Sequence, residues 1–392
     1  MAVPKLRFEE FKNEWKTINL KQILSFKNGI NANKDSYGRG IKYISVGDIL
    51  NNTFITYDKI KGLVDINEKV LKENSVEYGD IIFQRSSETF NDIGHSNVYL
   101  DKEKVATFGG FVIRGKKIGN YNPLFLNYLL KSPYNRRKII IKGAGAQHYN
   151  ISQEELEKIN INFTNENEQK KIANLFSLLD KKIELQKQKI EALKIYKKGL
   201  IQKLYDQKYN NKIKLKNIIK QKSIRNKNNE IKDIYSVNNK DGFILQSDQF
   251  KDRVVASEDT TNYKIIKKDY FAYNPARINV GSIARMKYEK IGIISPMYIC
   301  FECKNNVLPE YLEYFFETKI FTYEMKKRLE GSVRMCLSYE SMLNIPIDLP
   351  DIMQQKRISK VLNEFDKRIN YEEIKYNYQK RLKDGLLQKM FI

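Results

Sequence analysis

The sequence predicts an α+β protein of two pseudo-repeated globular domains and two long coiled-coil helices. Residues 145–206 reappear without a gap as residues 331–392, so the two copies are offset by 186 positions. Apolar side chains recur with a heptad pattern in both copies, and short apolar runs alternate with helical stretches in the segments before them. A chain of 392 residues can bury more than one core, which fits this division.

The repeat sets the expected boundaries. Gln169-Lys170-Lys171-Ile172 returns as Gln355-Lys356-Arg357-Ile358, and Gly199-Leu200-Ile201-Gln202 returns as Gly385-Leu386-Leu387-Gln388. We expect a first globular domain over residues 1–164 and a central helix over 165–207. A second globular domain should follow over 208–350, and a C-terminal helix over 351–392.

The charge balance favours a polyanionic partner. Lys and Arg number 70 against 47 Asp and Glu, a net charge of +23. Self-repulsion at this charge opposes compaction unless a polyanion neutralises it, so nucleic acid is the first partner to consider. An AT-rich genome would explain many lysines, but it does not readily explain the shortage of acidic residues.

The sequence indicates a cytoplasmic protein without a membrane partner. The N-terminus carries acidic residues and no apolar run, which is unlike a signal peptide, and the most apolar stretch, residues 291–301, has half the length of a membrane span. Three cysteines, an odd number, do not suggest a disulfide framework.

The two globular segments share a weaker repeat. Residues 79–83 parallel 268–272, and each is followed by a polar loop, 84–94 in one half and 273–281 in the other. An apolar run expected to form one strand comes next, 107–114 against 294–301. Helical stretches at 122–131 and 308–318 and short closing loops at 142–148 and 328–334 complete each α+β domain.

The loops diverge most while the segments around them match, which suggests related tasks with different specificity. Arginine can read guanine, and asparagine or glutamine can read adenine, through paired hydrogen bonds. Any one of these residues alone is more simply a solvated turn residue. As a group, the candidates for DNA contact are Arg85, Ser86, Ser87, Asn91, Gln147 and His148 in the first half and Asn274, Arg277, Asn279, Ser282 and Arg334 in the second.

Both long helices have a predicted start and an apolar seam. Asn165 precedes Glu168, and Asp351 precedes Gln354, each pair typical of a capping box. We expect the helices to pair with each other, rather than each on its own domain, and to set the distance between the domains. Gly199 and Gly385 would then mark a close approach or a bend. The seam consists of Ile172, Phe176, Leu179, Ile183, Ile190, Leu193, Ile358, Leu362, Phe365, Ile369, Leu386 and Met390, with polar residues at its centre.

Catalytic and metal motifs are not credible in this chain. The run 110–117 ends in lysine where a phosphate loop needs Ser or Thr. Cys300 and Cys303 are three apart in an expected strand and should point to opposite faces, as core cysteines rather than zinc ligands. The Asn274-Pro275-Ala276-Arg277 run lacks the aromatic residue of amino-methylating enzymes, so we expect no catalytic residue and no metal site.

The order of the motifs resembles the specificity subunit of type I restriction–modification systems over nearly the whole chain. The residues that carry the resemblance are the opening Pro4-Lys5-Leu6-Arg7-Phe8-Glu9-Glu10-Phe11, then Gly143-Ala144-Gly145-Ala146-Gln147, Glu168-Gln169-Lys170-Lys171-Ile172-Ala173 and Gly199-Leu200-Ile201-Gln202-Lys203-Leu204. The second copy departs from the pattern with Gln354 where the first has Glu168.

This resemblance implies two target-recognition domains that read the halves of a split double-stranded DNA sequence, separated by antiparallel helices. It implies two methylation subunits, which bring S-adenosylmethionine and modify adenine N6. Restriction subunits would bring ATP-driven translocation and cleavage, with the Mg²⁺ that this chemistry uses. The chain itself would hold no cofactor and would not be an enzyme.

Three alternatives remain open. The chain could serve a related system that methylates without cleaving. A coiled-coil scaffold would show no salt-sensitive retention on DNA, and an RNA-binding module would prefer single strands, for which 25 tyrosines could supply exposed aromatic side chains.

If the paired helices set the distance between half-sites, lengthening both by one turn should change the preferred gap in the DNA target. Half-sites on one face of a duplex lie about 34–36 Å apart, a distance that long helices can span. Selection of binding duplexes from a library with variable gaps would measure this, and an unchanged gap would contradict the hypothesis.

Overall fold

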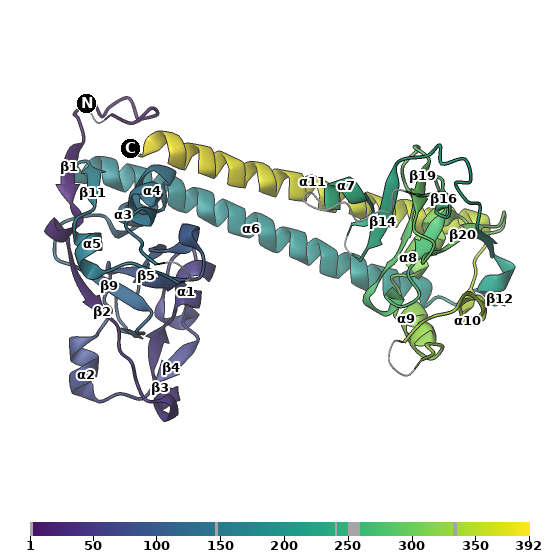
Figure 1. The fold of residues 1–392 in the computed structure, drawn as a ribbon, viewed down its shortest axis with the longest axis horizontal. Helices are drawn as coiled ribbons and strands as arrows, with labels where there is room; N and C mark the ends of the chain where they lie inside the picture. Colours follow the sequence, from purple (N-terminus) through teal and green to yellow (C-terminus); the bar gives the residue numbers. More distant parts are fainter. Residues whose placement is uncertain (1–2, 146–147, 240, 250–258, 332–334) are drawn as a thin grey trace. The chain divides into compact units, whose positions relative to one another are not determined.

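The structure, a computed structural model, describes residues 3–145, 148–239, 241–249, 259–331 and 335–392 (Figure 1). It divides into two compact units, Met1–Gln188 with Ile374–Ile392 and Lys189–Glu373. The border cuts both long helices, α6 (Glu166–Tyr205) and α11 (Ile352–Met390). Each unit therefore combines a globular part with a segment of each helix.

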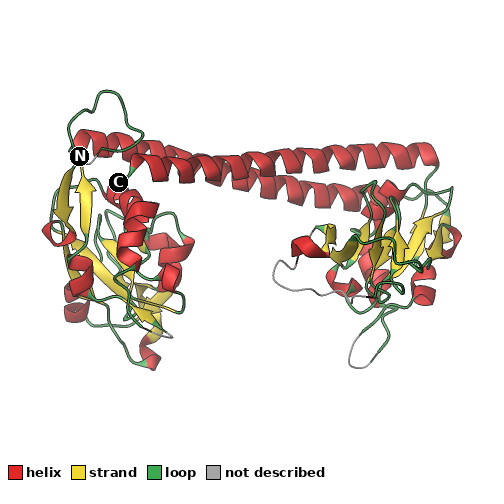
Figure 2. Ribbon diagram, turned by 45° about the horizontal axis from the view of Figure 1, so that its top comes forward, coloured by secondary structure: helices red, strands yellow, loops and turns green. Residues whose placement is uncertain are grey.

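The first unit contains a four-stranded sheet in the order β2-β9-β5-β7 and a three-stranded sheet in the order β4-β3-β8, and β1 pairs with β11. Short helices lie around these strands (Figure 2). The strands are β1 Lys16–Asn19, β2 Leu24–Asn28, β3 Tyr37–Ile44, β4 Gly62–Val64, β5 Ile81–Gln84, β6 Ser86–Ser87, β7 Ser96–Val98, β8 Thr107–Phe108, β9 Val112–Lys117, β10 Tyr149–Asn150 and β11 Asn160–Phe163. The helices are α1 Val46–Asn51, α2 Glu68–Glu73, α3 Pro123–Lys131, α4 Pro133–Ile140 and α5 Gln153–Glu157.

The second unit has two four-stranded sheets, β13-β20-β17-β18 and β15-β14-β19-β16, and β12 pairs with β21. The strands are β12 Lys212–Lys214, β13 Ile219–Lys222, β14 Ile234–Asn238, β15 Gly242–Leu245, β16 Lys264–Ile266, β17 Phe271–Tyr273, β18 Ile283–Arg285, β19 Gly292–Ile294, β20 Ile299–Cys303 and β21 Pro346–Asp348. The helices are α7 Gln246–Gln249, α8 Pro309–Phe315, α9 Lys319–Lys326 and α10 Tyr339–Leu343.

The two units share one topology, as the repeat predicts. β2, β9, β5 and β7 of the first correspond in order and direction to β13, β20, β17 and β18 of the second. Each unit also contains a parallel pair of strands, β3 with β8 and β14 with β19. The predicted α+β class and its internal duplication are confirmed.

One sequence prediction about the strands is wrong. Residues 107–114 and 294–301 were each expected to form a single strand, but a turn divides both runs. β8 ends at Phe108 and β9 begins at Val112, and β19 ends at Ile294 and β20 begins at Ile299. Gly109-Gly110 and Ser295-Pro296 occupy the turns, because glycine and proline fit turns better than they extend a ladder.

The predicted seam residues of the long helices lie on the sides of α6 and α11 that are turned away from solvent. All twelve predicted seam residues are buried or half-buried. The backbone N–H of Glu168 donates to Asn165 at 3.0 Å and that of Gln354 to Asp351 at 2.8 Å, so both N-caps form. Gly199 and Gly385 do not mark a close approach, since a Cβ at either position would meet no atom within 4 Å.

The helices are antiparallel in each unit. In the first, the rings of Phe176 and Phe391 stack with centroids 5.6 Å apart, and Asp180 pairs with Lys383. In the second, Lys189 pairs with Glu372 and Lys197 with Asp366, each at 2.7 Å. Later residues of α6 thus contact earlier residues of α11, as expected for antiparallel helices.

A buried glutamine joins each globular part to the start of a long helix. The side-chain oxygen of Gln169 accepts from the backbone of Asn122 at 2.9 Å, and that of Gln355 accepts from Leu308 at 2.8 Å. Each amide nitrogen donates to the carbonyl before the helix, of Thr164 or Pro350. The contacts explain the glutamine in the repeated motif, because an apolar residue would leave these buried groups unpaired.

A second repeated contact joins the globular part to both helices. The hydroxyl of Tyr128 donates to Asp180 at 2.7 Å, and Asp180 also pairs with Lys383. At positions offset by 186, the hydroxyl of Tyr314 donates to Asp366 at 2.6 Å, and Asp366 pairs with Lys197. In each unit the globular part, α6 and α11 contribute one member.

The fourth member of this cluster differs between the units. In the first it is Lys131, whose ammonium donates to the Thr53 carbonyl at 3.1 Å and to the Asn97 side chain at 3.3 Å. Burial, and then the neighbouring ammonium of Lys383, lowers the pKa of Lys131 to about 7, although the Asp180 carboxylate opposes this. In the second it is Glu317, which lies 3.6 Å from Lys197.

Replacing Lys131 with methionine should weaken the rise of stability with pH. The folded-state pKa of about 7 lies below the ordinary value of 10.5, so between these values the unfolded chain binds more protons and stability increases with pH. The thermal midpoint of wild type should therefore rise from pH 7 toward pH 10 more than that of Lys131→Met. Lys116→Met, which removes an exposed lysine of the same unit, is the control. Equal pH dependence in all three proteins would contradict this account.

Candidate nucleic-acid interface

Three loops meet at one edge of the first unit. The loop that follows β5 forms the short strand β6, which pairs with β10 from the closing loop at 142–150. The N–H of Ile151 donates to the Arg85 carbonyl at 3.0 Å, and the N–H of Arg85 donates to the Phe111 carbonyl at 2.8 Å. The loop at 84–94, the turn at 109–111 and the described residues 144–145 and 148–150 of the closing loop therefore form one connected surface.

The loop at 84–94 is anchored from beneath by Arg136. The guanidinium of Arg136 donates to the carbonyls of Asn91 at 3.0 Å and Ile93 at 2.9 Å. Burial lowers the pKa of Arg136 to about 10. Burial, and then the Arg136 charge, also lowers the pKa of His95 at the base of the loop. These buried groups hold the backbone of the loop, so its exposed side chains remain available for a ligand.

The structure brings most first-half candidates onto this surface. Arg85, Ser86 and Ser87 are half-buried, and Asn91 and His148 are exposed. The Ser86 hydroxyl donates to Asn150 at 2.5 Å, and Arg85 Nη1 donates to the Gly110 carbonyl at 3.3 Å. Gln147 lies outside the described residues.

The second unit holds the corresponding loop in the same way. Asn274 N–H donates to the Ser282 carbonyl at 3.1 Å and closes the loop. Gly281 (φ 90°) ends it in a backbone conformation that side chains disfavour. The N–H of Leu337 donates to the Pro275 carbonyl at 3.0 Å, which reproduces the contact between Ile151 and Arg85.

A groove of about 990 Å³ runs beside this second loop. Its described lining contains no acidic residue, one arginine, and many amide and hydroxyl groups. The side chains most relevant to binding are Asn238, Asn239, Asn274, Arg277, Met297 and Tyr298. Amide groups and a single arginine suit base edges, which present both hydrogen-bond donors and acceptors.

The second-half candidates do not all face this groove. Asn274 and Arg277 line it, and Arg277 and Asn279 are exposed. Asn279 does not line the groove, whereas Ser282 lines it but is only 4% exposed. The Ser282 hydroxyl lies 3.3 Å from the Val237 carbonyl, so this residue supports the loop. Arg334 lies outside the described residues.

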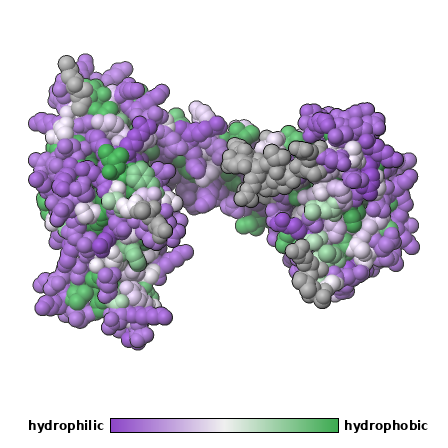
Figure 3. All heavy atoms as spheres, viewed as in Figure 1, coloured by the Kyte–Doolittle hydropathy of each residue, from purple (hydrophilic) through white to green (hydrophobic). Residues whose placement is uncertain are grey.

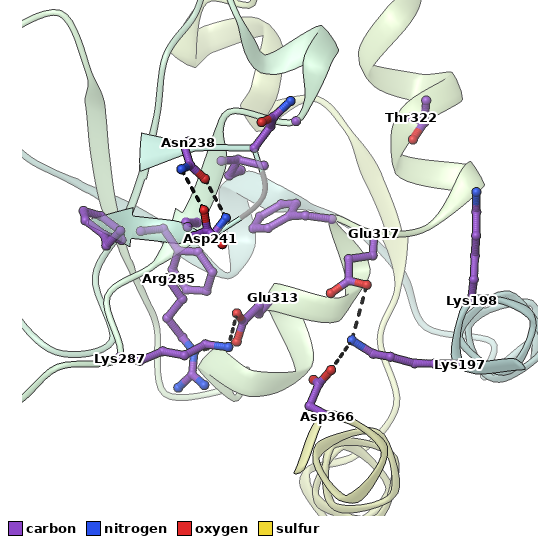
Figure 4. A pocket seen from close by; sticks show the side chains of 18 of the residues that line it. Lys197, Lys198, Asn238, Asp241, Arg285, Lys287, Glu313, Glu317, Thr322 and Asp366 are labelled. Carbon is purple, nitrogen blue, oxygen red and sulfur yellow. Dashed lines mark hydrogen bonds and ion pairs between the residues drawn. The ribbon is translucent and has the colours of Figure 1, made fainter. Parts of the chain in front are cut away.

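A second cavity of the same unit, of about 890 Å³, has the opposite character. Most of its basic and acidic side chains pair with each other, as Figure 4 shows for Lys197 between Glu317 and Asp366, and for Lys287 with Glu313. Arg285 forms ion pairs with three carboxylates. Because these ion pairs neutralise most of the charge of the lining, this cavity suits a phosphate less well and we assign it a structural role.

Sequence reasoning missed the residues at the turns between β8 and β9 and between β19 and β20. Phe111 is 68% exposed and Met297 is 62% exposed, although both were assigned to strands. The Gly109-Gly110 and Ser295-Pro296 pairs could have revealed these turns. Cys300 and Cys303 do point to opposite sides as predicted, since Cys300 is buried in one core and Cys303 packs against another.

A metal site and a membrane-spanning helix are two further possibilities to compare with the described residues. Hydrophilic side chains cover most of the face in Figure 3. The described residues include no group of three or more His, Cys, Asp or Glu arranged to hold a metal ion. No helix in the described ranges is long and apolar enough to cross a membrane.

Comparison with solved structures shows the same fold in other proteins. The S subunit of the type I restriction–modification system from M. genitalium has a TM-score of 0.59 at 18% identity, over 100% of this chain and 99% of that one. A chain from a study of complex assembly and conformational transition in the type I R-M system has a TM-score of 0.60 at 11% identity, over 96% and 97%. At these identities the likeness concerns the fold.

Sequence relatives cover shorter stretches. The chain is 30% identical over 208 residues to the putative type I restriction enzyme MjaX specificity subunit of Methanocaldococcus jannaschii, which is 51% of this chain and 48% of that protein. It is 28% identical over 102 residues to the type I restriction enzyme MjaVIII specificity subunit of that organism, 26% of this chain and 24% of that protein. The matches thus span about half and a quarter of these relatives.

The family itself is identified by a domain that occurs twice. The model of the type I restriction modification DNA specificity domain matches residues 12–194 and again residues 211–378, one copy in each half of the internal repeat. Since these two copies cover most of the sequence, the chain belongs to the family of type I restriction–modification DNA specificity proteins.

Proposed function

We propose that this chain is the sequence-specific DNA-recognition subunit of a type I restriction–modification complex. It would read a bipartite target in double-stranded DNA, one half with each unit, and position the subunits that carry out the chemistry. In this proposal the chain contributes no catalytic residue.

The observation that carries the proposal is that the two units hold their loops by the same backbone contact, whereas the loops themselves differ in sequence. Ile151 and Leu337, at positions offset by 186, make the same backbone contact to the recognition loops of their units. The loops that they support differ in length and residues, with Arg85-Ser86-Ser87 in one and Asn274-Pro275-Ala276-Arg277 in the other. Binding specificity favours variable loops on a rigid frame, so this arrangement fits two readers of different sequences.

Electrostatics supports DNA as the ligand. The net charge of +23 favours association with a polyanion, while the groove beside Asn274 and Arg277 has uncharged amides where bases would be read. Phosphate contacts and base contacts would thus come from different parts of the surface. An RNA-binding protein or a DNA-free scaffold explains this combination less well.

Membership of the family supports a proposal for the partners. We propose two methylation subunits that bind S-adenosylmethionine and modify adenine N6, and restriction subunits that use ATP and Mg²⁺. The chain would act in the cytoplasm, where these subunits meet DNA. In a system that methylates without restriction subunits, this chain would likewise recognise the DNA target and bind the methylation subunits.

The pattern of adenine methylation in genomic DNA, with and without this gene, tests the proposal directly. Loss of one asymmetric motif made of two short parts would support it and would also identify the target. Unchanged methylation, together with no salt-sensitive retention of the purified chain on duplex DNA, would exclude it. Methylation without restriction of foreign DNA would indicate the methylation-only system.

Exchanging the loop at 84–94 for the corresponding loop of a relative with another target should change one half of the methylated motif and leave the other half unchanged. The loop is held at its base by Gln84, Gly94 and His95, so the exchange should preserve the fold if these three residues are kept. Sequencing of methylated adenines provides the measurement. A change in both halves would contradict independent reading by the two units.

Arg277 gives a sharper test in the second unit. Replacing it with alanine should weaken binding to the target duplex by roughly ten- to a hundredfold, since a paired contact to guanine contributes about 1–3 kcal/mol of discrimination. Arg277→Lys retains the charge but loses the planar pair of donors. If Arg277 contacts only phosphate, Lys should restore most of the affinity, and if it reads a base, Lys should not. Fluorescence anisotropy with target and unrelated duplexes separates the two outcomes.

A further inference from the structure

An exposed apolar side chain occupies the same turn in both units. In the first, Val112 N–H donates to the Gly109 carbonyl at 2.9 Å and closes a turn with Phe111 at its tip. In the second, Tyr298 N–H donates to the Ser295 carbonyl at 3.1 Å and closes a turn with Met297 at its tip. Phe111 and Met297 are offset by 186, so the position belongs to the internal repeat.

Both side chains extend into solvent from a firm support. Phe111 is 68% exposed and Met297 is 62% exposed. Each turn connects a strand of one sheet to a strand of the other, β8 to β9 and β19 to β20, so neither tip can move far without disturbing two sheets. Single exposed apolar residues are common on protein surfaces, and exposure alone would carry no conclusion.

Both tips lie next to polar groups of the recognition loops. The Arg85 backbone and guanidinium donate to the carbonyls of Phe111 and Gly110, at 2.8 and 3.3 Å. Met297 Sδ lies 3.6 Å from the Asn274 side-chain nitrogen, and it lines the groove that Arg277 also lines. In each unit the apolar tip therefore stands among the polar groups that we propose to contact DNA bases.

Duplex DNA offers an apolar tip two kinds of partner, the thymine methyl group and the faces of stacked base pairs. Proteins that unstack a base step insert apolar side chains such as phenylalanine and methionine, while polar neighbours contact the adjacent groove. A side chain at the end of a stiff turn, flanked by hydrogen-bonding groups, has the reach and the support for insertion.

We propose that Phe111 and Met297 are wedge residues that insert at a base step within each half-site and partly unstack it. This rests on the proposed function, because it requires that the units read DNA. It assigns to each unit a readout of duplex deformability besides hydrogen bonding to base edges, so the steps favoured there would be flexible pyrimidine–purine steps.

The test uses the full chain and duplexes that carry the methylated motif, with one 2-aminopurine at a time placed along each half-site. Wild type should raise the fluorescence severalfold at one step in each half-site. Phe111→Ala should abolish the signal in one half-site only, and Met297→Ala in the other. Each should weaken binding to the target about tenfold and leave binding to unrelated duplexes and the slope of affinity against salt unchanged.

Matched controls distinguish insertion from general loss of apolar surface. Ile118→Ala in the first unit and Ile291→Ala in the second remove exposed apolar side chains away from the recognition loops and should change nothing. Phe111→Leu should retain part of the signal. Because both tips are exposed, thermal midpoints should stay within a few degrees of wild type.

The outcomes separate this inference from the proposed function. If wild type prefers its target but no position gains fluorescence, or if uracil in place of thymine reproduces the loss seen with Phe111→Ala, the wedge is overturned and the recognition function stands. Equal loss of affinity for target and unrelated duplexes would overturn it as well. If wild type shows no preference for the target, the proposed function is wrong and the inference falls with it.

Discussion

The hydrophobic core of each unit is completed by side chains from both long helices, and the rest of the structure depends on this arrangement. In the first unit, Phe176 near the start of α6 and Phe391 beyond the end of α11 pack together with Trp15 and Phe125. In the second, Tyr205 stacks on Tyr311 with centroids 4.7 Å apart, in the core that also contains Ile358. A solitary helix cannot bury such a stripe in water, so the globular parts and the helix pair must stabilise one another.

Hydrogen bonds set the orientation of the long helices against the globular parts, which the apolar contacts hold together. The buried glutamines Gln169 and Gln355 join the helix starts to the globular parts. The hydroxyls of Tyr128 and Tyr314 join the globular parts to carboxylates on α6 and α11. Hydrophobic burial is non-directional, whereas these hydrogen bonds specify register and rotation. The same contacts recur 186 residues apart, which explains why this part of the repeat is the best preserved between the two halves.

The loops vary because they do not take part in this support. Arg85 and Pro275 offer the same carbonyl to the same backbone partner, so their side chains can differ without cost to the fold. In the cavity lined by Lys197, Glu317 and Asp366, by contrast, these side chains form ion pairs with each other and so contribute to the support. In the proposed function recognition and support are therefore separated, and recognition belongs to the loops and to the turns at Phe111 and Met297.

The duplication, the α+β class and both long helices could be predicted from the sequence, because they follow from local periodicity and from residues repeated at a fixed offset. The candidate loops at 84–94 and 273–281 could also be chosen from the sequence, because they are polar and differ between two halves whose flanking segments match. Three features became visible in the folded chain alone: Ser282 is buried, Gly199 and Gly385 face no close neighbour, and Phe111 and Met297 lie at exposed turns. Burial and exposure at these positions depend on segments distant in the sequence, such as Val237 beneath Ser282 and Arg85 beside Phe111, which no local pattern encodes.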